Sequence, residues 1–274
     1  MSRFFMKTHT IGESQWSRDD LLNALEEFSS IYENRPIQDN EGGMKAAQMF
    51  YAWFVAKSLQ PKTIIESGIW YGQSTWMFEQ AVPDADLFCI DPATYYKKGY
   101  TSTKAKYFKK DFTKIDWSQV NPKTTVCFFD DHQNALQRMI HCAQLGFQHL
   151  MFEDNYPPGK GDCYSLKKAF HASETRTLLP GLAIRDYCEN LIDVYQEFPP
   201  IISPEMNRWG EPWSTYDVDE PLITEIQKDF QSIYAEESEN YTWVNYVKLK
   251  EFEKSKHCIQ LTDLKKKFDW SSMV

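Results

Sequence analysis

The chain has 274 residues, a net charge of −9 at neutral pH and a sequence pI near 5.2. Its composition, 42% hydrophobic and 25% charged, is typical of a globular protein with a substantial core. An acidic surface repels phosphate backbones, which argues against general nucleic-acid binding. The one local exception is the lysine-rich stretch YYKKGYTSTKAKYFKK, residues 95–110, which we interpret as a solvated face beside the ligand site.

Cysteine usage and the first residues of the chain indicate a reduced, cytoplasmic protein. None of the six cysteines forms a CxxC pair, and Cys89 and Cys127 lie inside apolar runs, so neither a zinc site nor a disulfide framework is expected. MSRFFMKTHT holds no apolar segment long enough for a signal peptide, and no run of 18 apolar residues occurs. We expect buried thiols and no membrane association, and a homo-oligomer is compatible with these features.

Two helices are predicted before residue 61. The first follows Ser17, a good N-cap, and carries apolar residues at helical spacing up to Pro36. The second, residues 44–61, is rich in apolar and aromatic side chains and ends at Pro61. We interpret residues 12–60 as a helical cap that packs on a sheet.

Short apolar strands then alternate with helices, which predicts a parallel sheet covered on both faces. Helices are expected at 72–82 and at 134–146, the second ending at Gly146. The strands are expected at TIIES (63–67), DLFCID (86–91), KYFKKD (106–111), TTVCFFD (124–130) and HLMFED (149–154). The fold class is therefore α/β: a Rossmann-like, doubly wound, mostly parallel seven-stranded sheet with a core over residues 61–155.

The last third of the chain is less regular. Residues 156–220 contain proline clusters at PPGKGD, EFPPIISP and RWGEPW, and we expect an irregular segment that serves a function. A helix is predicted at 223–237, and strands at 241–250 and 257–262 are expected to form an antiparallel edge hairpin. Because no linker separates a second unit, one domain is expected over residues 1–274, with 221–274 as its C-terminal part.

The turn after the first strand, ESGIWYGQS, is the main indicator of a cofactor. Gly68 and Gly72 allow a tight strand-to-helix turn, and Asp91 ends the next strand, where such folds bind a ribose diol. Trp70 stands where a dinucleotide fingerprint has its middle glycine, and would collide with a pyrophosphate on the helix N-terminus. The cofactor is therefore expected to be a nucleoside without a pyrophosphate.

This pattern, ExGxxxGxS with an acid after the second strand, resembles the class I S-adenosylmethionine-dependent methyltransferases. It is most similar to their catechol O-methyltransferase-like group, with macrocin-type and cephalosporin-biosynthesis proteins among the relatives. The resemblance implies S-adenosyl-L-methionine as cofactor, with Glu66, Gly68 and Ser74 at its methionine end, Asp91 at its ribose and Asp111 beside its adenine. The full expected cofactor-binding set is Glu66, Gly68, Trp70, Gly72, Ser74, Asp91, Asp111 and Asp130.

Acidic residues follow two further strands, in FFDDHQ and FEDNYPP. The carboxyl ends of parallel strands share one rim, so Asp131, Asp154 and Asn155 are predicted to ligate a hard cation such as Mg²⁺. Metal-dependent O-methyltransferases carry similar Asp-His and Asp-Asn pairs, and the resemblance covers roughly residues 40–160. The alternative is a pair of solvated turns.

The general base departs from the pattern of the catechol enzymes. They place a lysine three residues beyond the first aspartate, where this chain has Asn134. Asp131 and His132 are therefore the candidate catalytic residues, with His132 as the nearest base. A structural hydrogen bond is the other interpretation of His132.

The acceptor is expected to contact the proline-rich segment, whose rings and few polar groups suit a small molecule or a sugar. Its candidate residues are Tyr156, Tyr164, Arg185, Tyr187, Tyr195, Trp209, Trp213 and Tyr216. Two other functions stay open: a nicotinamide oxidoreductase, against which Trp70 counts, and a non-catalytic module that binds a glycan, a natural product or a protein.

Overall fold

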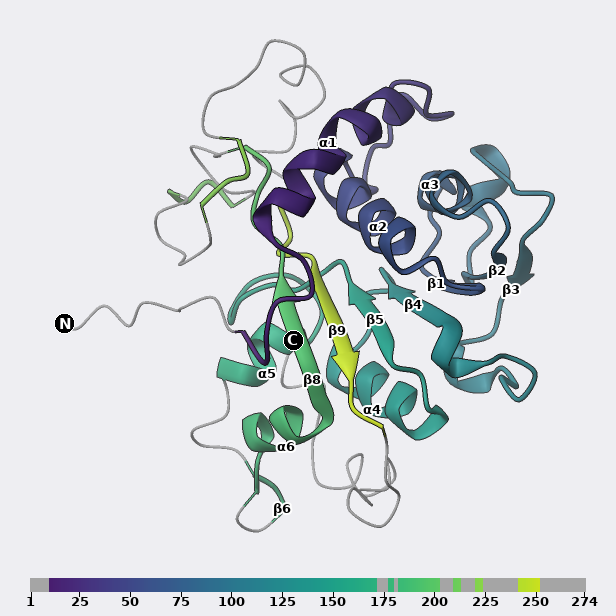
Figure 1. Ribbon diagram of the computed structural model, residues 1–274. Coiled ribbons are helices and arrows are strands. Elements are labelled where there is room, and N and C mark those ends of the chain that lie inside the picture. The colour runs from purple at the N-terminus through teal and green to yellow at the C-terminus, as the bar shows by residue number, and fades with distance from the viewer. Residues whose placement is uncertain are drawn as a thin grey trace.

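In the computed structural model the chain forms a seven-stranded mixed sheet with helices on both faces (Figure 1). The structure describes residues 10–171, 177–179, 182–202, 209–212, 220–223 and 241–251. The sheet order is β3-β2-β1-β4-β5-β9-β8; the first five strands run parallel, and β9 pairs antiparallel with both β5 and β8. Its strands are β1 (Thr63–Ser67), β2 (Asp86–Ile90), β3 (Lys106–Phe108), β4 (Thr125–Phe129), β5 (His149–Phe152), β8 (Ile192–Glu197) and β9 (Asn245–Leu249). The expected fold class is confirmed.

Two hydrophobic cores separate the helices by face. One core joins side chains of α1 (Arg18–Tyr32), α2 (Ala46–Leu59) and α3 (Gln73–Ala81) to one side of the sheet. The other lies against α4 (Ala135–Leu145), α5 (Leu166–His171) and α6 (Ile184–Leu191). Smaller elements are the 3₁₀ helices η1 (Tyr95–Lys98), η2 (Phe112–Lys114) and η3 (Pro122–Thr124), and the paired strands β6 (Thr177–Leu179) and β7 (Leu182–Ala183).

Local signals in the sequence set several helix ends. Ser17 and Asp20 form a capping box at the start of α1, and Gly146 ends α4 in the left-handed region at φ 85°. Five cysteines are buried and free, as expected, and Cys258 lies outside the described residues. Within the described ranges, no helix is both long enough and apolar enough to cross a bilayer.

The sheet has the expected antiparallel edge, but the predicted pairing of its strands is wrong. The strand β9 falls inside the predicted 241–250 strand, but its neighbours are β5 and β8, so both of its edges are already occupied. Residues 257–262 and the helix expected at 223–237 lie outside the described residues. The outermost strand, β8, comes instead from the segment expected to be irregular, and a bridge from Ile11 to Tyr195 covers its outer edge.

Residues 156–220 are also more regular than predicted, because they contain α5, α6 and β8. A buried polar network ties this segment to the sheet. Asn155 donates to Tyr195 (2.7 Å) and accepts from the backbone of Lys167, whose ammonium pairs with Glu197 at 2.5 Å. Every member is largely buried, so each needs its partners to offset the lost hydration.

The parallel sheet reverses its strand order between β1 and β4, which is where folds of this kind bind ligands. The two chain segments leave the sheet there in very close contact. A Cβ atom on Gly68, just after β1, would lie 1.9 Å from the carbonyl oxygen of Asp130, just after β4. Gly68 also has φ 92°, which favours glycine.

A matched pair of glycine substitutions tests this close contact. Gly159 has φ 78° but nothing within 4 Å of the place that a Cβ would take, so Gly159→Ala carries only the backbone cost, about 1–2 kcal/mol. Gly68→Ala adds a collision with backbone, worth roughly a further 1–3 kcal/mol. Urea unfolding of both variants measures the difference, and equal losses of unfolding free energy would show that the contact is not tight.

Candidate functional site

A cavity of about 470 Å³ lies at the carboxyl ends of β1, β2, β4 and β5. Eight residues expected at the site line it: Gly68, Trp70, Asp91, Asp111, Asp130, Asp131, His132 and Asp154. Four others do not line it: Glu66, Gly72, Ser74 and Asn155. The sequence therefore predicted the acidic part of the rim and its glycine turn, and the residues of the second group lie behind the cavity wall.

Glu66 lies beneath the glycine turn rather than in the cavity. Its carboxylate accepts hydrogen bonds from the hydroxyls of Ser74 and Thr75 in α3 and from the thiol of Cys89 in β2. Burial raises the pKa of Glu66 to about 7, and these three hydrogen bonds oppose that rise. Glu66 thus fastens β1, β2 and the start of α3 together and supports the turn.

Asp91 holds the turn from the other side. Its Oδ2 accepts from the backbone N–H groups of Ile69 (3.1 Å) and Trp70 (3.2 Å), and its Oδ1 accepts from Ala93. Trp70 takes the left-handed conformation, φ 51°, although it is not a glycine. The bond from its backbone N–H to Asp91 and the bond from its indole to the carbonyl of Glu41 offset the cost of this conformation for a tryptophan.

The segment before α2, with the first turn of that helix, forms a wall of the cavity that the sequence did not predict. Its lining residues are Gly42, Gly43, Met44, Lys45 and Gln48. The Trp70 indole donates to the carbonyl of Glu41 at 3.0 Å, and a Cβ on Gly42 would lie 3.6 Å from that ring. Two adjacent glycines, Gly42 and Gly43, indicate close packing in the sequence. No local pattern indicates that the residue packed against Gly42 is Trp70.

Arg138, in α4, is a second residue that sequence reasoning missed. Its guanidinium binds both oxygens of Asp111 (3.2 and 2.6 Å), and Nε donates to Asp131 Oδ2 at 3.0 Å. Burial by itself would raise the pKa of Asp111, but the hydrogen bonds from Arg138 outweigh this and hold the pKa well below its usual range. Arg138 therefore links the ends of β3 and β4 across the rim.

The same contacts restrict Asp131. Its Oδ2 also accepts from the Ser67 hydroxyl at 2.6 Å, and Oδ1 accepts weakly from the backbone of Gln133. Asn134, the next polar residue, caps α4 by accepting from the backbone N–H of Gln137. Asp131 is thus already paired with Arg138.

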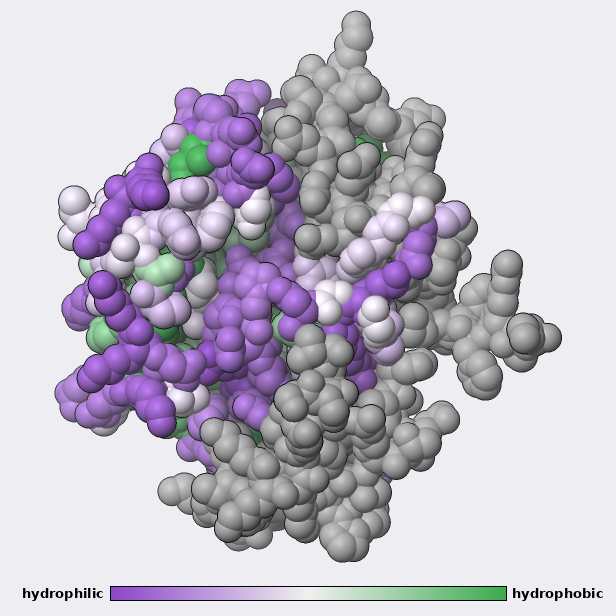
Figure 2. All heavy atoms as spheres, turned by 180° about the vertical axis from the view of Figure 1, so that it is seen from behind, coloured by the Kyte–Doolittle hydropathy of each residue, from purple (hydrophilic) through white to green (hydrophobic). Residues whose placement is uncertain are grey.

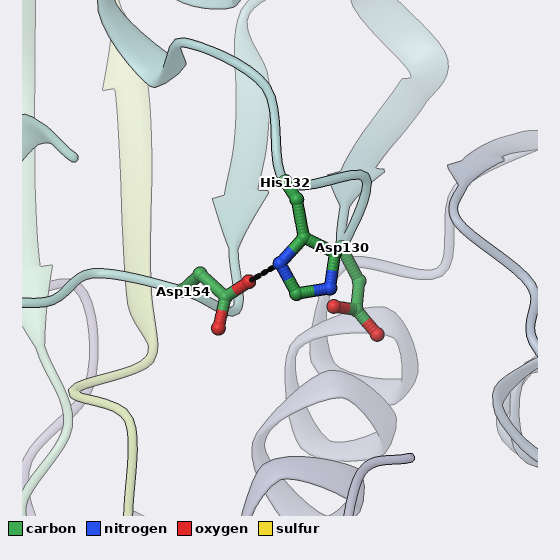
Figure 3. A group of neighbouring side chains, drawn as sticks. All are labelled: Asp130, His132 and Asp154. Carbon is green, nitrogen blue, oxygen red and sulfur yellow. Dashed lines mark ion pairs between the residues drawn. The ribbon is translucent and has the colours of Figure 1, made fainter. Parts of the chain in front are cut away.

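A different group gathers ligand atoms of the kind that hold a metal ion. Atoms of Asp130, His132 and Asp154 lie within 4.8 Å of one another, with the imidazole between the two carboxylates (Figure 3). His132 Nδ1 lies 3.0 Å from Asp154 and 3.1 Å from Asp162. Two carboxylates and one imidazole suit a divalent cation.

The charges of this group depend on one another. The hydrogen bond to Asp154 raises the pKa of His132 to about 10, although burial opposes the rise. The same bond, against the cost of burial, lowers the pKa of Asp154 to about 2. Burial, and then the Asp154 charge, raise the pKa values of Asp130 and Glu153 well above their usual range. Both shifts favour the charged pair, an imidazolium on His132 and a carboxylate on Asp154.

Asn155, expected as a metal ligand, is turned away from this group. Its side chain is fully buried, and it forms hydrogen bonds with Tyr195, Glu197 and the backbone of Lys167. It anchors the strand end that carries Asp154. Asp130, His132 and Asp154 form one group of donors and Asp154, Asp162 and Cys163 another; Asp154, which both groups share, belongs to the expected metal set.

Comparisons with known proteins add partial similarities. No family model and no curated protein matches the chain. It is similar to the O-methyltransferase TomG from Streptomyces achromogenes in complex with SAM, at 13% identity over 53% of this chain and 67% of that one, with a TM-score of 0.36. The SAH-bound methyltransferase PaMTH1 from Podospora anserina matches at 15% identity over 54% and 64%, with a TM-score of 0.34. A cmcI structure with Mg and SAM matches at 18% over 39% and 52%, with a TM-score of 0.31.

The raised pKa of Glu66 predicts a specific pH dependence of stability. Between its usual value of 4.5 and about 7 the folded state holds a proton that the unfolded state has lost, so stability falls as pH rises through this window. Two and a half pKa units correspond to about 3 kcal/mol. Urea unfolding at pH 5 and pH 8 measures this. Between these two pH values the wild type should lose about this much more unfolding free energy than Glu66→Gln does. An equal pH dependence of the two proteins would contradict the prediction.

Proposed function

We propose that this chain is an S-adenosylmethionine-dependent O-methyltransferase that methylates a hydroxyl of a small molecule or a sugar, assisted by a divalent cation. The observation that carries the proposal is the cavity at the strand-order reversal, where the glycine turn and the acids of four strands meet. Six carboxyl groups line it: Asp91, Asp111, Asp130, Asp131, Glu153 and Asp154. Such a lining favours cationic ligands, and both a sulfonium and a metal ion are cations.

The cofactor would lie along the rim from Gly68 to Asp111. When bound, S-adenosylmethionine supplies a methyl group on a positively charged sulfonium. Gly68 would allow close approach of a ligand to the backbone, and the carboxylate of Asp91, held by the amides of the turn, would accept hydrogen bonds from ribose hydroxyls with its remaining lone pairs. Asp111, restrained by Arg138, stands at the nucleoside end.

Glu66 and Ser74 support the cofactor indirectly in this proposal. They bond to each other under the turn and so fix the start of α3. Gly72 has a similar role: at φ 86° it begins α3, and a Cβ there would lie 2.2 Å from the carbonyl of Tyr100. These are positioning residues, and Trp70 provides the contact surface that the turn presents to the cavity.

The proposed cation is held by Asp130, His132 and Asp154. It would supply Lewis acidity, lowering the pKa of the acceptor hydroxyl. His132 accepts a proton only after it loses the one it shares with Asp154 and Asp162, and cation binding competes with that proton. Asp131, bound to Arg138 and Ser67, keeps the neighbouring loop in place.

The acceptor is proposed to enter beside Tyr156 and Thr242, which line the cavity on the side of β5 and β9. Tyr156 packs edge-on against Trp209 at 5.7 Å, and Trp209 stacks on Trp243. Of these three rings Tyr156 lines the cavity, and the two tryptophans pack behind it, so a fixed aromatic ring is available to a sugar or a flat phenol. Trp213 and Tyr216 lie outside the described residues, as does the side chain of Arg185.

Binding of S-adenosylhomocysteine tests the cofactor. Asp91→Asn keeps an acceptor for the turn but loses the charge, and we expect it to weaken binding by about 10- to 100-fold in titration calorimetry. Asp86→Ala, at the opposite end of the same strand, is the matched control and should bind as wild type does. Absence of binding to the wild-type protein at millimolar ligand would refute the proposal.

Metal binding is a separate test. Mn²⁺ titration followed by the paramagnetic resonance of the free ion should show a site that Asp154→Asn weakens by about 100-fold or more, with proton release at pH 7. The exposed Asp116, replaced by Asn, serves as the control. Unchanged affinity in Asp154→Asn, or methyl transfer that persists fully in EDTA, would remove the cation and leave the cofactor proposal standing.

A further inference from the structure

The lysine-rich stretch forms a basic strip that the proposed reaction does not use. Residues 95–114 contain seven lysines and one acid, Asp111, which is already paired with Arg138. Because the strip contributes +6 to the total of −9, the rest of the chain carries −15. The basic strip is defined by Lys97, Lys98, Lys104, Lys106, Lys109, Lys110 and Lys114.

All seven lysines are exposed, and none pairs with a carboxylate in the part of the chain that the structure describes. They surround β3, which has β2 as its one partner among the described strands. In Figure 2, seen from behind, hydrophilic side chains dominate the flank that carries β2 and β3 in Figure 1. Unpaired positive charge is therefore concentrated on one edge of an acidic molecule.

The backbone beneath the lysines is held in place. Tyr96 stacks on Tyr107 with ring centroids 4.5 Å apart, and Glu79 of α3 accepts hydrogen bonds from the hydroxyls of Tyr100 and Ser102. The amide of Tyr100 also donates to Tyr71 at 2.8 Å. These contacts present the charges on a fixed surface, which lowers the entropy lost on binding.

The basic strip also adjoins the cavity at both of its ends. It begins after Pro92 and reaches Asp111, and both of these residues line the cavity. Tyr95, 42% exposed, lies 4.9 Å from Trp70 between their ring centroids, and Trp70 is a cavity residue. An exposed aromatic ring therefore lies between the lysines and the proposed reaction site.

We propose that the basic strip binds a single-chain anionic saccharide, bearing carboxylate or sulfate groups, as the acceptor of the reaction. Lysines pair with its acidic groups, Tyr95 stacks against a sugar ring, and a hydroxyl of a ring further along the chain reaches the side of the cavity lined by Tyr156. This inference rests on the proposed function, because it names the class of hydroxyl acceptor for the same site.

Two alternative roles for the lysines predict different binding behaviour. Lysines on an edge strand discourage pairing with other sheets, and this use needs no ligand. A nucleic-acid duplex carries one charge per about 1.7 Å of its axis and would extend beyond this short strip onto strongly acidic surface. A flexible chain of lower charge density fits the strip without meeting that surface.

The test uses a fluorescent hexamer of galacturonic acid and the full chain. In the quadruple variant Lys97→Glu, Lys98→Glu, Lys109→Glu and Lys110→Glu we expect affinity to fall by about tenfold or more, with a shallower dependence on salt. A control variant removes the same charge elsewhere: Lys57→Glu, Lys62→Glu, Lys123→Glu and Lys250→Glu. It should lose less than about threefold. A neutral maltohexaose should not compete.

Several outcomes would overturn the proposal: no binding of the hexamer to wild type, equal losses in the two variants, or tighter strip-dependent binding of single-stranded DNA than of the saccharide. Titration with S-adenosylhomocysteine separates this failure from failure of the proposed function, since the strip variant should bind it as wild type does. If the wild type binds the saccharide through the basic strip but does not bind S-adenosylhomocysteine, the saccharide-binding role of the strip is supported and the methyltransferase proposal is refuted.

Discussion

The contact between Gly68 and the Asp130 carbonyl is the constraint on which the rest of the site depends. It brings the ends of β1 and β4 so close that no side chain fits between them. The backbone bond from Asp130 to Ser67, at 2.8 Å, continues the strand pairing up to this point. The two segments then have to diverge, and the space that opens between them is the cavity. A glycine is needed because the same position has a positive φ and no room for a Cβ.

Carboxylates stabilise this opening from both sides of the turn. Glu66 binds the start of α3 from below, and Asp91 binds the backbone of Ile69 and Trp70 from above. Burying Glu66 is costly, which its raised pKa reflects, but the hydroxyl and thiol donors around it satisfy its oxygens. The arrangement combines a rigid turn with a rim of acids whose positions are fixed by their partners.

The molecule separates its charges. Its cavity is lined by carboxyl groups, two of them paired with Arg138, while seven lysines lie outside on the β3 edge. Arg138 and His132 act inside as internal counter-ions, because each is bound to two carboxylates. This division lets an acidic cavity favour cations while a neighbouring surface favours anions.

The sequence by itself determined the alternating strands and helices, the glycine turn and the acids at the strand ends. These features are set by local periodicity and turn chemistry, which act over a few residues. Only the tertiary structure decided which acids are free. Arg138 binds Asp131 and Asp111, Asn155 turns toward Tyr195, and residues 42–45 and 48 line the cavity. It also decided that β8, not residues 257–262, borders β9. Each of these depends on side chains far apart in the chain whose partners are chosen by packing, and no local pattern encodes that choice.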